Sequence, residues 1–233
     1  MLTILIGRAK TGKSDTMLRR MAELGESSQQ ILLVPEHASH QAEVDVCRAC
    51  GDTASRHAEV LSFRRLGERV LSITGGIADV TLDNGGKLLT LQRALLETAP
   101  QMTVYRKPSQ KVGFLEQMLA LFDELRSYEV TPEILYQQAQ DIDGATHDKL
   151  TDLSLLYAAY EARLRRPGLD ARDRMTKLCD HLEESGYVRG KDIFIDGFTY
   201  FNAQERRALA IFLRQARSVT VTLLGEVNSR EEI

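Results

Sequence analysis

The sequence is short of cysteine, of excess positive charge and of long apolar runs, and each shortage excludes a class of protein. Its three cysteines, Cys47, Cys50 and Cys179, cannot all pair, which indicates a reducing, intracellular setting. The net charge of -3 excludes a basic footprint over the whole surface, so any contact with DNA must be local. No apolar run approaches membrane-spanning length, and the start lacks the features of a signal peptide. We therefore expect a cytoplasmic protein.

Five short runs rich in isoleucine, valine and leucine predict strands that are buried on both faces. Such runs are typical of parallel sheets covered by helices. Patterns of helical period lie between them. The strands are expected at Leu2–Ile6, Gln30–Val34, Ala58–Leu61, Asp192–Asp196 and Val219–Leu224, and the helices at Asp15–Leu24, Glu36–Cys50, Phe63–Ile73 and Asn202–Ala216.

The middle of the chain has a different character, because it contains no convincing strand from about residue 83 to residue 190. Leucine and aromatic residues recur there at helical spacing, and Thr131-Pro132 predicts the start of a helix. Glycines punctuate the entry and the exit of this segment. We therefore predict an α/β fold at residues 1–82 and 190–233, interrupted by a large all-helical insertion at residues 83–189.

The first predicted strand runs into a sequence of the form G-x-x-x-x-G-K-[ST], the pattern of a P-loop. Its glycines permit turns that point backbone N–H groups at phosphate oxygens, and its lysine reaches the β- and γ-phosphates of a nucleotide. A chance match in a chain of this length is on the order of one in a hundred. The alternative is a glycine-rich turn that binds nothing. The predicted nucleotide-binding residues are Gly7, Arg8, Ala9, Lys10, Thr11, Gly12, Lys13 and Ser14.

A P-loop site normally has an aspartate at the end of a neighbouring strand, where it holds Mg²⁺. The run Ile193–Asp196 has that form, so Ser14 and Asp196 are the predicted magnesium ligands, with a plain turn aspartate as the alternative. Gly197 follows, at a position where many P-loop motors carry a glutamate that polarises the attacking water. General-base help contributes roughly 10²–10⁴ in rate. We therefore expect nucleotide to bind while hydrolysis is slow or absent, and we assign no catalytic residue.

Four segments carry a family signal: the loop at residues 7–14, VPEHASHQAE at 34–43, VLSFRRL at 60–66 and IDGFTYFNAQE at 195–205. In that order they resemble the GRAGSGKS-like loop and the VPEQxSFQAE, VLSFxRL and IDGFTxFxxQE segments of the AddB family (RexB in some lineages). AddB is the second subunit, beside AddA, of bacterial ATP-dependent helicase–nucleases. His37 and His40 depart from the family pattern. The resemblance covers essentially the whole chain.

The resemblance implies a P-loop NTPase fold in which the α/β part is a RecA-like helicase domain 1A and the helical insertion is domain 1B. The same segments resemble degraded forms of the first RecA-like domain of UvrD/Rep helicases. The AddB family acts as a heterodimer with an AddA motor subunit, processes DNA double-strand breaks for recombination and recognises a Chi-type sequence. ATP and Mg²⁺ are the implied cofactors, and AddA and DNA the implied partners. The family's nuclease domain and iron–sulfur cysteines lie beyond this chain.

The resemblance also places one group of residues where helicase-like domains face single-stranded DNA. A hydroxyl, an aromatic ring and cations suit phosphate contacts and base stacking, while a core phenylalanine flanked by surface arginines is the alternative. The pair Cys47-x-x-Cys50 has no partner pair for a metal site, and we interpret its cysteines as packing residues. The DNA-binding candidates are His37, Ser62, Phe63, Arg64 and Arg65.

Three other functions compete with an ATP-binding, hydrolysis-impaired module. An active DNA-stimulated motor ATPase needs a water-activating carboxylate and a second RecA-like domain, and the sequence displays neither. A P-loop small-molecule kinase would use the helical insertion as a lid, but it leaves the segments at 60–66 and 195–205 unexplained. A scaffold with a relic P-loop would not bind ATP with Mg²⁺ at millimolar concentration.

Overall fold

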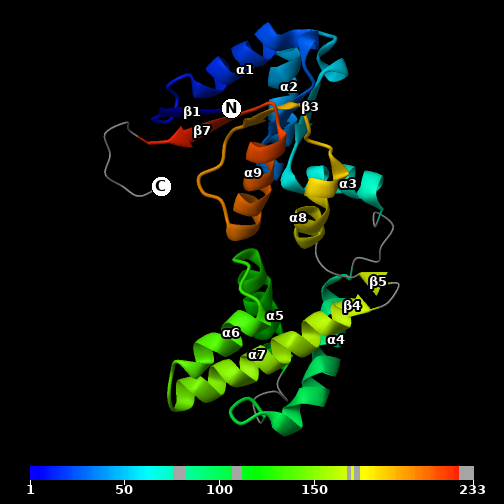
Figure 1. The fold of residues 1–233 in the computed structure, drawn as a ribbon, viewed down its shortest axis with the longest axis vertical. Helices are drawn as coiled ribbons and strands as arrows, with labels where there is room; N and C mark the ends of the chain where they lie inside the picture. Colours follow the sequence, from blue (N-terminus) through cyan, green and yellow to red (C-terminus); the bar gives the residue numbers. More distant parts are fainter. Residues whose placement is uncertain (76–81, 107–111, 167–168, 171–173, 226–233) are drawn as a thin grey trace. The chain divides into compact units, whose positions relative to one another are not determined.

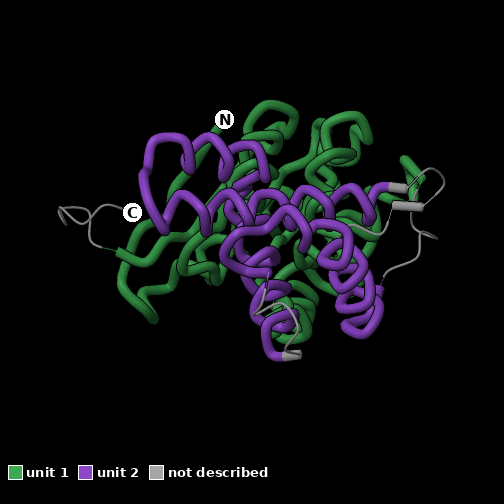
Figure 2. The backbone as a smooth tube through the Cα atoms, turned by 90° about the horizontal axis from the view of Figure 1, so that it is seen from below, with its two compact units in different colours: residues 1–77, 174–233 green, residues 78–173 purple. Residues whose placement is uncertain are grey.

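The computed structural model describes residues 1–75, 82–106, 112–166, 169–170 and 174–225. The chain divides into two compact units, coloured green and purple in Figure 2. Unit 1 contains residues 1–77 and 174–233, and unit 2 contains residues 78–173. Within the described part of the chain, no helix is both long and apolar enough to cross a membrane.

Unit 1 is built on a five-stranded sheet whose strands are all parallel. The order across the sheet is β1-β7-β6-β2-β3, so β7 lies between β1 and β6. Strands β2 and β6 are buried at every position, as expected for central strands with helices on both faces. The strands are β1 (Leu2–Gly7), β2 (Gln30–Leu33), β3 (Ala58–Leu61), β6 (Asp192–Ile195) and β7 (Ser218–Leu224).

Helices cover both faces of this sheet and make three layers (Figure 1). On one face lie α1 (Lys13–Leu24) and α2 (Ser39–Cys50), and on the other lie α3 (Phe63–Thr74), α8 (Arg174–Ser185) and α9 (Ala203–Gln215). Right-handed crossovers produce this division, because the connections from β1 to β3 cross the sheet in one direction and those from β3 to β7 return in the other. Short 3₁₀ turns at Gly25–Ser27, Glu36–Ala38 and Ala54–Arg56 complete unit 1.

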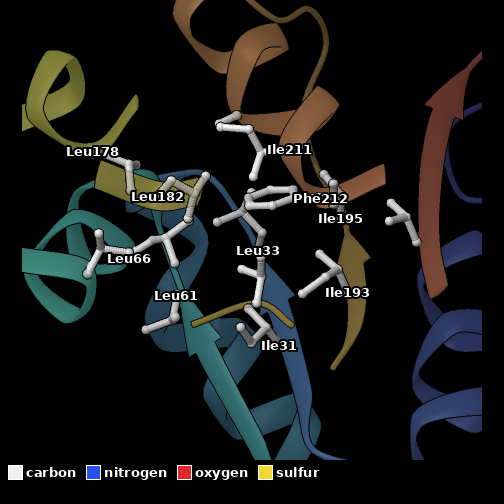
Figure 3. Close-up of a cluster of buried hydrophobic side chains, with 14 residues drawn as sticks. Ile31, Leu33, Leu61, Leu66, Leu178, Leu182, Ile193, Ile195, Ile211 and Phe212 are labelled. Atoms are coloured by element: carbon white, nitrogen blue, oxygen red, sulfur yellow. The ribbon is translucent and has the colours of Figure 1, made fainter. Parts of the chain in front are cut away.

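Each face of the sheet has its own hydrophobic core. Beneath α1 and α2, Met17 and Met21 pack against Phe194, and all three are almost completely buried. On the opposite face, Figure 3 shows Leu33 of β2 and Ile195 of β6 close to Phe212 of α9. The two cores hold the sheet rigid, so the loops at the carboxyl ends of its strands have fixed supports.

Three helices of the chain begin at side-chain caps that the sequence makes recognisable. Asn202 and Glu205 form a complete capping box at the start of α9, which confirms the predicted helix start. Thr131 caps α6 through the N–H of Ile134, with proline at the first position of the helix. Ser62 caps α3 through the N–H of Arg65. These caps satisfy N–H groups that the helices leave without partners.

Unit 2 packs its helices around an aromatic core. Phe122 stacks on Tyr157 with a centroid distance of 4.6 Å and lies 5.9 Å from Tyr160. The buried carboxylate of Asp152 accepts hydrogen bonds from the backbone N–H groups of residues 103–105, at 2.7 to 3.1 Å, and thereby fixes that loop against α7. The helices are α4 (Asn84–Thr98), a 3₁₀ turn at Ala99–Gln101, α5 (Val112–Ser127), α6 (Pro132–Gln140) and α7 (Ala145–Leu164).

The structure differs from the sequence prediction at the end of the inserted segment. The segment was predicted to be all helical, but β4 (Arg165–Arg166) and β5 (Leu169–Asp170) form a two-residue antiparallel pair. Two-residue strands give no periodic signal, so the pattern of side chains does not reveal them. The boundary between the units also falls before α8 rather than at residue 190, because Leu178 and Leu182 pack into the core of unit 1.

Candidate nucleotide-binding site

The loop between β1 and α1 has the backbone shape of an anion-binding concavity. Lys10 and Gly12 adopt positive φ angles of 61° and 81°. Alternation of right- and left-handed residues turns successive N–H groups toward one point. Gly12 caps α1 without a side-chain bond, so the first N–H groups of that helix also face the loop. The result is a ring of donors at the positive end of a 12-residue helix.

The side chain of Lys13 closes this loop from within. Its Nζ donates hydrogen bonds to the carbonyl oxygens of Gly7 (2.8 Å) and Arg8 (2.7 Å). The hydroxyl of Thr11 also donates to Arg8 O, at 2.9 Å. A Cβ on Gly7 would stand only 2.6 Å from Thr11 Oγ1, so the loop has room for glycine alone at this position. These observations fit a polyphosphate chain, because the ammonium group and the N–H groups converge on the space where phosphate oxygens bind.

The two predicted magnesium ligands line one cavity of about 160 Å³ beside the loop. Ser14 comes from the first turn of α1, and Asp196 follows the last residue of β6. Asp196 is fixed on both sides, because its N–H donates to Leu33 O at 3.0 Å and its Oδ1 accepts a hydrogen bond from the Thr222 hydroxyl. Gln41 of α2 lines the same cavity. Hydroxyl and carboxylate oxygens are the ligands that Mg²⁺ prefers.

Gly197 follows Asp196 in a backbone conformation that disfavours any side chain. Its φ is +81°, and a Cβ there would lie 3.3 Å from Cδ of Pro35. A left-handed conformation costs a residue other than glycine roughly 1–2 kcal/mol. A glutamate at position 197 would therefore require both the turn and Pro35 to move. The position next to Asp196 supplies no group that deprotonates water.

The candidate DNA-binding residues lie around the carboxyl ends of β2 and β3. Ser62 is buried and donates a hydrogen bond to Glu36, so its hydroxyl supports the turn. Phe63 is partly buried and meets Phe198 edge-on at 5.7 Å. The remaining three candidates are exposed or half-exposed: His37 in the turn after β2, and Arg64 and Arg65 in the first turn of α3.

Both arginines of this group are held by carboxylates of neighbouring elements. Arg64 contacts Glu36 at 2.5 Å and Glu68 at 3.1 Å, and Arg65 contacts Glu43 at 2.5 Å. Hydrogen bonds from Arg64 and then from Ser62 hold the pKa of the Glu36 carboxyl below its usual value. Glu36 therefore remains ionised and ties the turn after β2 to the start of α3. A phosphate group that approached these arginines would compete with carboxylates of the protein itself.

Comparison with known families identifies the chain. The family described as "ADDB, N-terminal" matches residues 4–233. The chain belongs to this family. Three relatives, each named as the second (B) component of an ATP-dependent helicase/deoxyribonuclease, are 31% (Clostridium kluyveri), 37% (Desulforamulus reducens) and 34% (Moorella thermoacetica) identical, over 100%, 95% and 95% of this chain. The matched regions are 21%, 20% and 20% of these relatives, so the chain spans about a fifth of their length.

Within this AddB N-terminal chain, three residues of the site have no place in the motifs that the sequence displays. Thr222 contacts Asp196, Glu36 orders the turn next to the arginines, and Gln41 lines the magnesium-side cavity. Thr222 had a detectable signal, because Thr220 and Thr222 alternate with valines in an otherwise buried strand. Glu36 and Gln41 stand in the segment at residues 34–43, but helical spacing does not distinguish such residues from a solvated face.

Proposed function

We propose that this chain is an ATP-binding module without motor activity, part of a helicase–nuclease complex. One contrast carries the proposal. A loop with converging donors and Lys13 stands beside Asp196, while the next position is a strained Gly197. Such a site retains groups for binding polyphosphate and lacks the adjacent group for activating water. ATP is then a ligand that stabilises the module rather than its fuel.

In this proposal each group has a separate task. The N–H groups of residues 7–14 bind the phosphate oxygens, and Lys13 exchanges its loop carbonyls for the β- and γ-phosphates. Ser14 and Asp196 would hold Mg²⁺, whose charge neutralises the phosphates when it is bound. Thr222 keeps the Asp196 carboxylate oriented, so the metal side of the site is ordered in advance.

Binding and turnover of MgATP, measured on the same sample, test this function. We expect saturable binding, with hydrolysis at least about 100-fold slower than the roughly 1 s⁻¹ at the lower end of typical enzymes, because general-base help of 10²–10⁴ is lost. Calorimetric titration gives the binding, and release of phosphate, with and without single-stranded DNA, gives the turnover. Steady hydrolysis that Lys13→Ala abolishes would contradict the proposal, and so would the absence of binding at millimolar MgATP.

The proposed setting follows from the family. The names of the relatives designate one component of a larger enzyme, and we propose an AddA-type motor subunit as the partner of this chain in a heterodimer. The complex would process DNA double-strand breaks for recombination and recognise a Chi-type sequence. Helicase and exonuclease activities would belong to the assembled complex, and this chain would contribute the module of domains 1A and 1B.

We propose that single-stranded DNA contacts the carboxyl edge of the sheet at His37, Phe63, Arg64 and Arg65, with Ser62 supporting the turn beneath them. The exposed guanidinium groups suit phosphates. Their pairing with Glu36 and Glu43 has a consequence, because DNA must displace carboxylates as it binds. Exposed ion pairs of this kind contribute little to stability, so the exchange costs little.

Arg65→Ala is expected to weaken single-stranded DNA binding and to lower the slope of log affinity against log salt by about 0.7, the value for one phosphate contact. The loss should be similar for all sequences, since a phosphate contact reads no base. Anisotropy of a labelled oligonucleotide, at several salt concentrations, measures both quantities. Arg214→Ala, in the last turn of α9, removes the same charge at the opposite edge of the sheet and serves as the control. An unchanged slope for Arg65→Ala would refute this contact.

A further inference from the structure

Two separate cavities flank the phosphate loop, and they differ in chemistry. The cavity that contains Ser14 and Asp196 lies toward β6 and α2. The other is a groove of about 520 Å³ that is lined by β1 and by the start of α1. Among the described residues, none lines both. The groove is large enough for part of a nucleotide, since small-molecule sites typically measure about 300–1,000 Å³.

The direction of a bound nucleotide follows from these two cavities. Its terminal phosphates and the metal belong beside Ser14 and Asp196, because those are the metal-binding oxygens. The nucleoside must then leave the loop on the other side, where Gly7, Gly12 and Thr16 border the groove. Strand β1 is the last strand of the sheet within the part of the chain that the structure describes, so its outer side is open to a ligand.

The wall that this groove offers to a base is aliphatic. It is formed by Ile4, Leu5 and Ile6, and the side chains of Ile4 and Ile6 are exposed by 47% and 37%. Such a surface packs against the flat face of any base and does not distinguish one base from another. The groove has no aromatic, amide or carboxylate side chain among the described residues that line it.

The polar side chains of the groove are already engaged with the loop. The hydroxyls of Thr11 and Thr16 donate to Arg8 O and Gly12 O, both at 2.9 Å. Lys13 belongs to the phosphates. The exposed edge of β1 offers backbone donors and acceptors in alternation, which suit the edges of several bases. Specific reading of one base needs placed groups that only that base satisfies, and such sites discriminate by about 10⁴–10⁵.

We infer that the groove beside β1 is a nucleoside subsite that accepts any base, so that the site binds nucleoside triphosphates as a class rather than ATP alone. This inference rests on the proposed function of the loop. Affinity comes from the triphosphate and the metal, and Ile4 and Ile6 add an apolar contact of equal strength for purines and pyrimidines.

Titration of the chain with the Mg²⁺ complexes of ATP, GTP, CTP, UTP and inorganic triphosphate tests the inference. We expect the four nucleotides to have dissociation constants within about threefold of one another, and triphosphate to bind within about tenfold of them. Ile4→Ser should weaken all four nucleotides by an equal factor of about 3–10 and leave triphosphate unchanged, which also verifies that the variant is folded. Leu2→Ser is the matched control, since Leu2 is equally exposed on the same strand but does not line the groove.

The outcomes separate the subsite from the function on which it rests. An affinity for ATP more than about 30-fold above that for GTP, CTP and UTP would overturn the inference and leave ATP binding intact. Equal nucleotide affinities of Ile4→Ser and Leu2→Ser would also overturn it, because the base would then lie elsewhere. Failure of all five ligands to bind would overturn the inference together with the proposed function.

Discussion

Lys13→Ala is expected to weaken MgATP binding by at least about 100-fold. The ammonium group of Lys13 bonds to two loop carbonyls, and in the bound state two phosphate oxygens would replace them. Hydrogen bonds to charged groups contribute about 1.5–3 kcal/mol each, so the loss of two amounts to about 3 kcal/mol or more. With about 1.4 kcal/mol for each factor of ten, the dissociation constant rises by two orders of magnitude. Calorimetric titration with MgATP measures this change.

A second variant distinguishes the loss of a phosphate contact from a general loss of positive charge. Arg214 lies near the end of α9, at the opposite edge of the sheet, where it pairs with Glu183 at 3.2 Å. Arg214→Ala removes one charge and should leave the affinity for MgATP within about twofold, since exposed charges at this distance are screened. Thermal unfolding checks that both variants fold. If Lys13→Ala bound MgATP as tightly as the unaltered chain, the assignment of the loop would be wrong.

The sheet of unit 1 could be predicted because each of its strands is a local signal. β3 has the predicted bounds, and the other four strands begin or end within one residue of them. Strand order has no such signal, since it depends on which connections cross the sheet. The division before α8 has the same origin, because the stripe of Leu178 and Leu182 indicates a buried helix face without naming the core that it enters.

The candidate site divides in the same way. Residues 7–14 are contiguous, and the geometry of a phosphate loop is set by its own glycines, so the sequence identifies it directly. The network of Glu36 with Ser62 and Arg64 joins segments that are 26 and 28 residues apart. The bond from Thr222 to Asp196 spans the same 26 residues across two strands. Only the folded chain brings such pairs together, which is why the sequence predicts the arginines as free cations.

At the edge of the sheet opposite the phosphate loop, the buried carboxylate of Asp192 is the most demanding polar group of unit 1. Arg217 donates to both of its oxygens, with 3.1 Å between Nε and Oδ1, and Ser218 donates at 2.6 Å. Ser28 donates to Oδ2. Burial by itself raises the pKa of Asp192, but the hydrogen bonds from Arg217, Ser218 and Ser28 outweigh it and leave the pKa below its usual value.

Asp192→Ala is expected to lower the free energy of unfolding by about 3 kcal/mol at pH 7. Breaking a buried pair costs about 3–5 kcal/mol, and the low end applies because Arg217 is half-exposed and returns to water. Since the folded pKa of Asp192 lies below the unfolded value of about 3.9, the contribution is fully present above that value and disappears as the pH falls through the folded pKa. Urea unfolding at pH 7, 5, 4 and 3 should therefore show the two proteins converging in acid. A constant difference between them down to pH 3 would mean that the carboxylate charge does not stabilise this edge of the sheet.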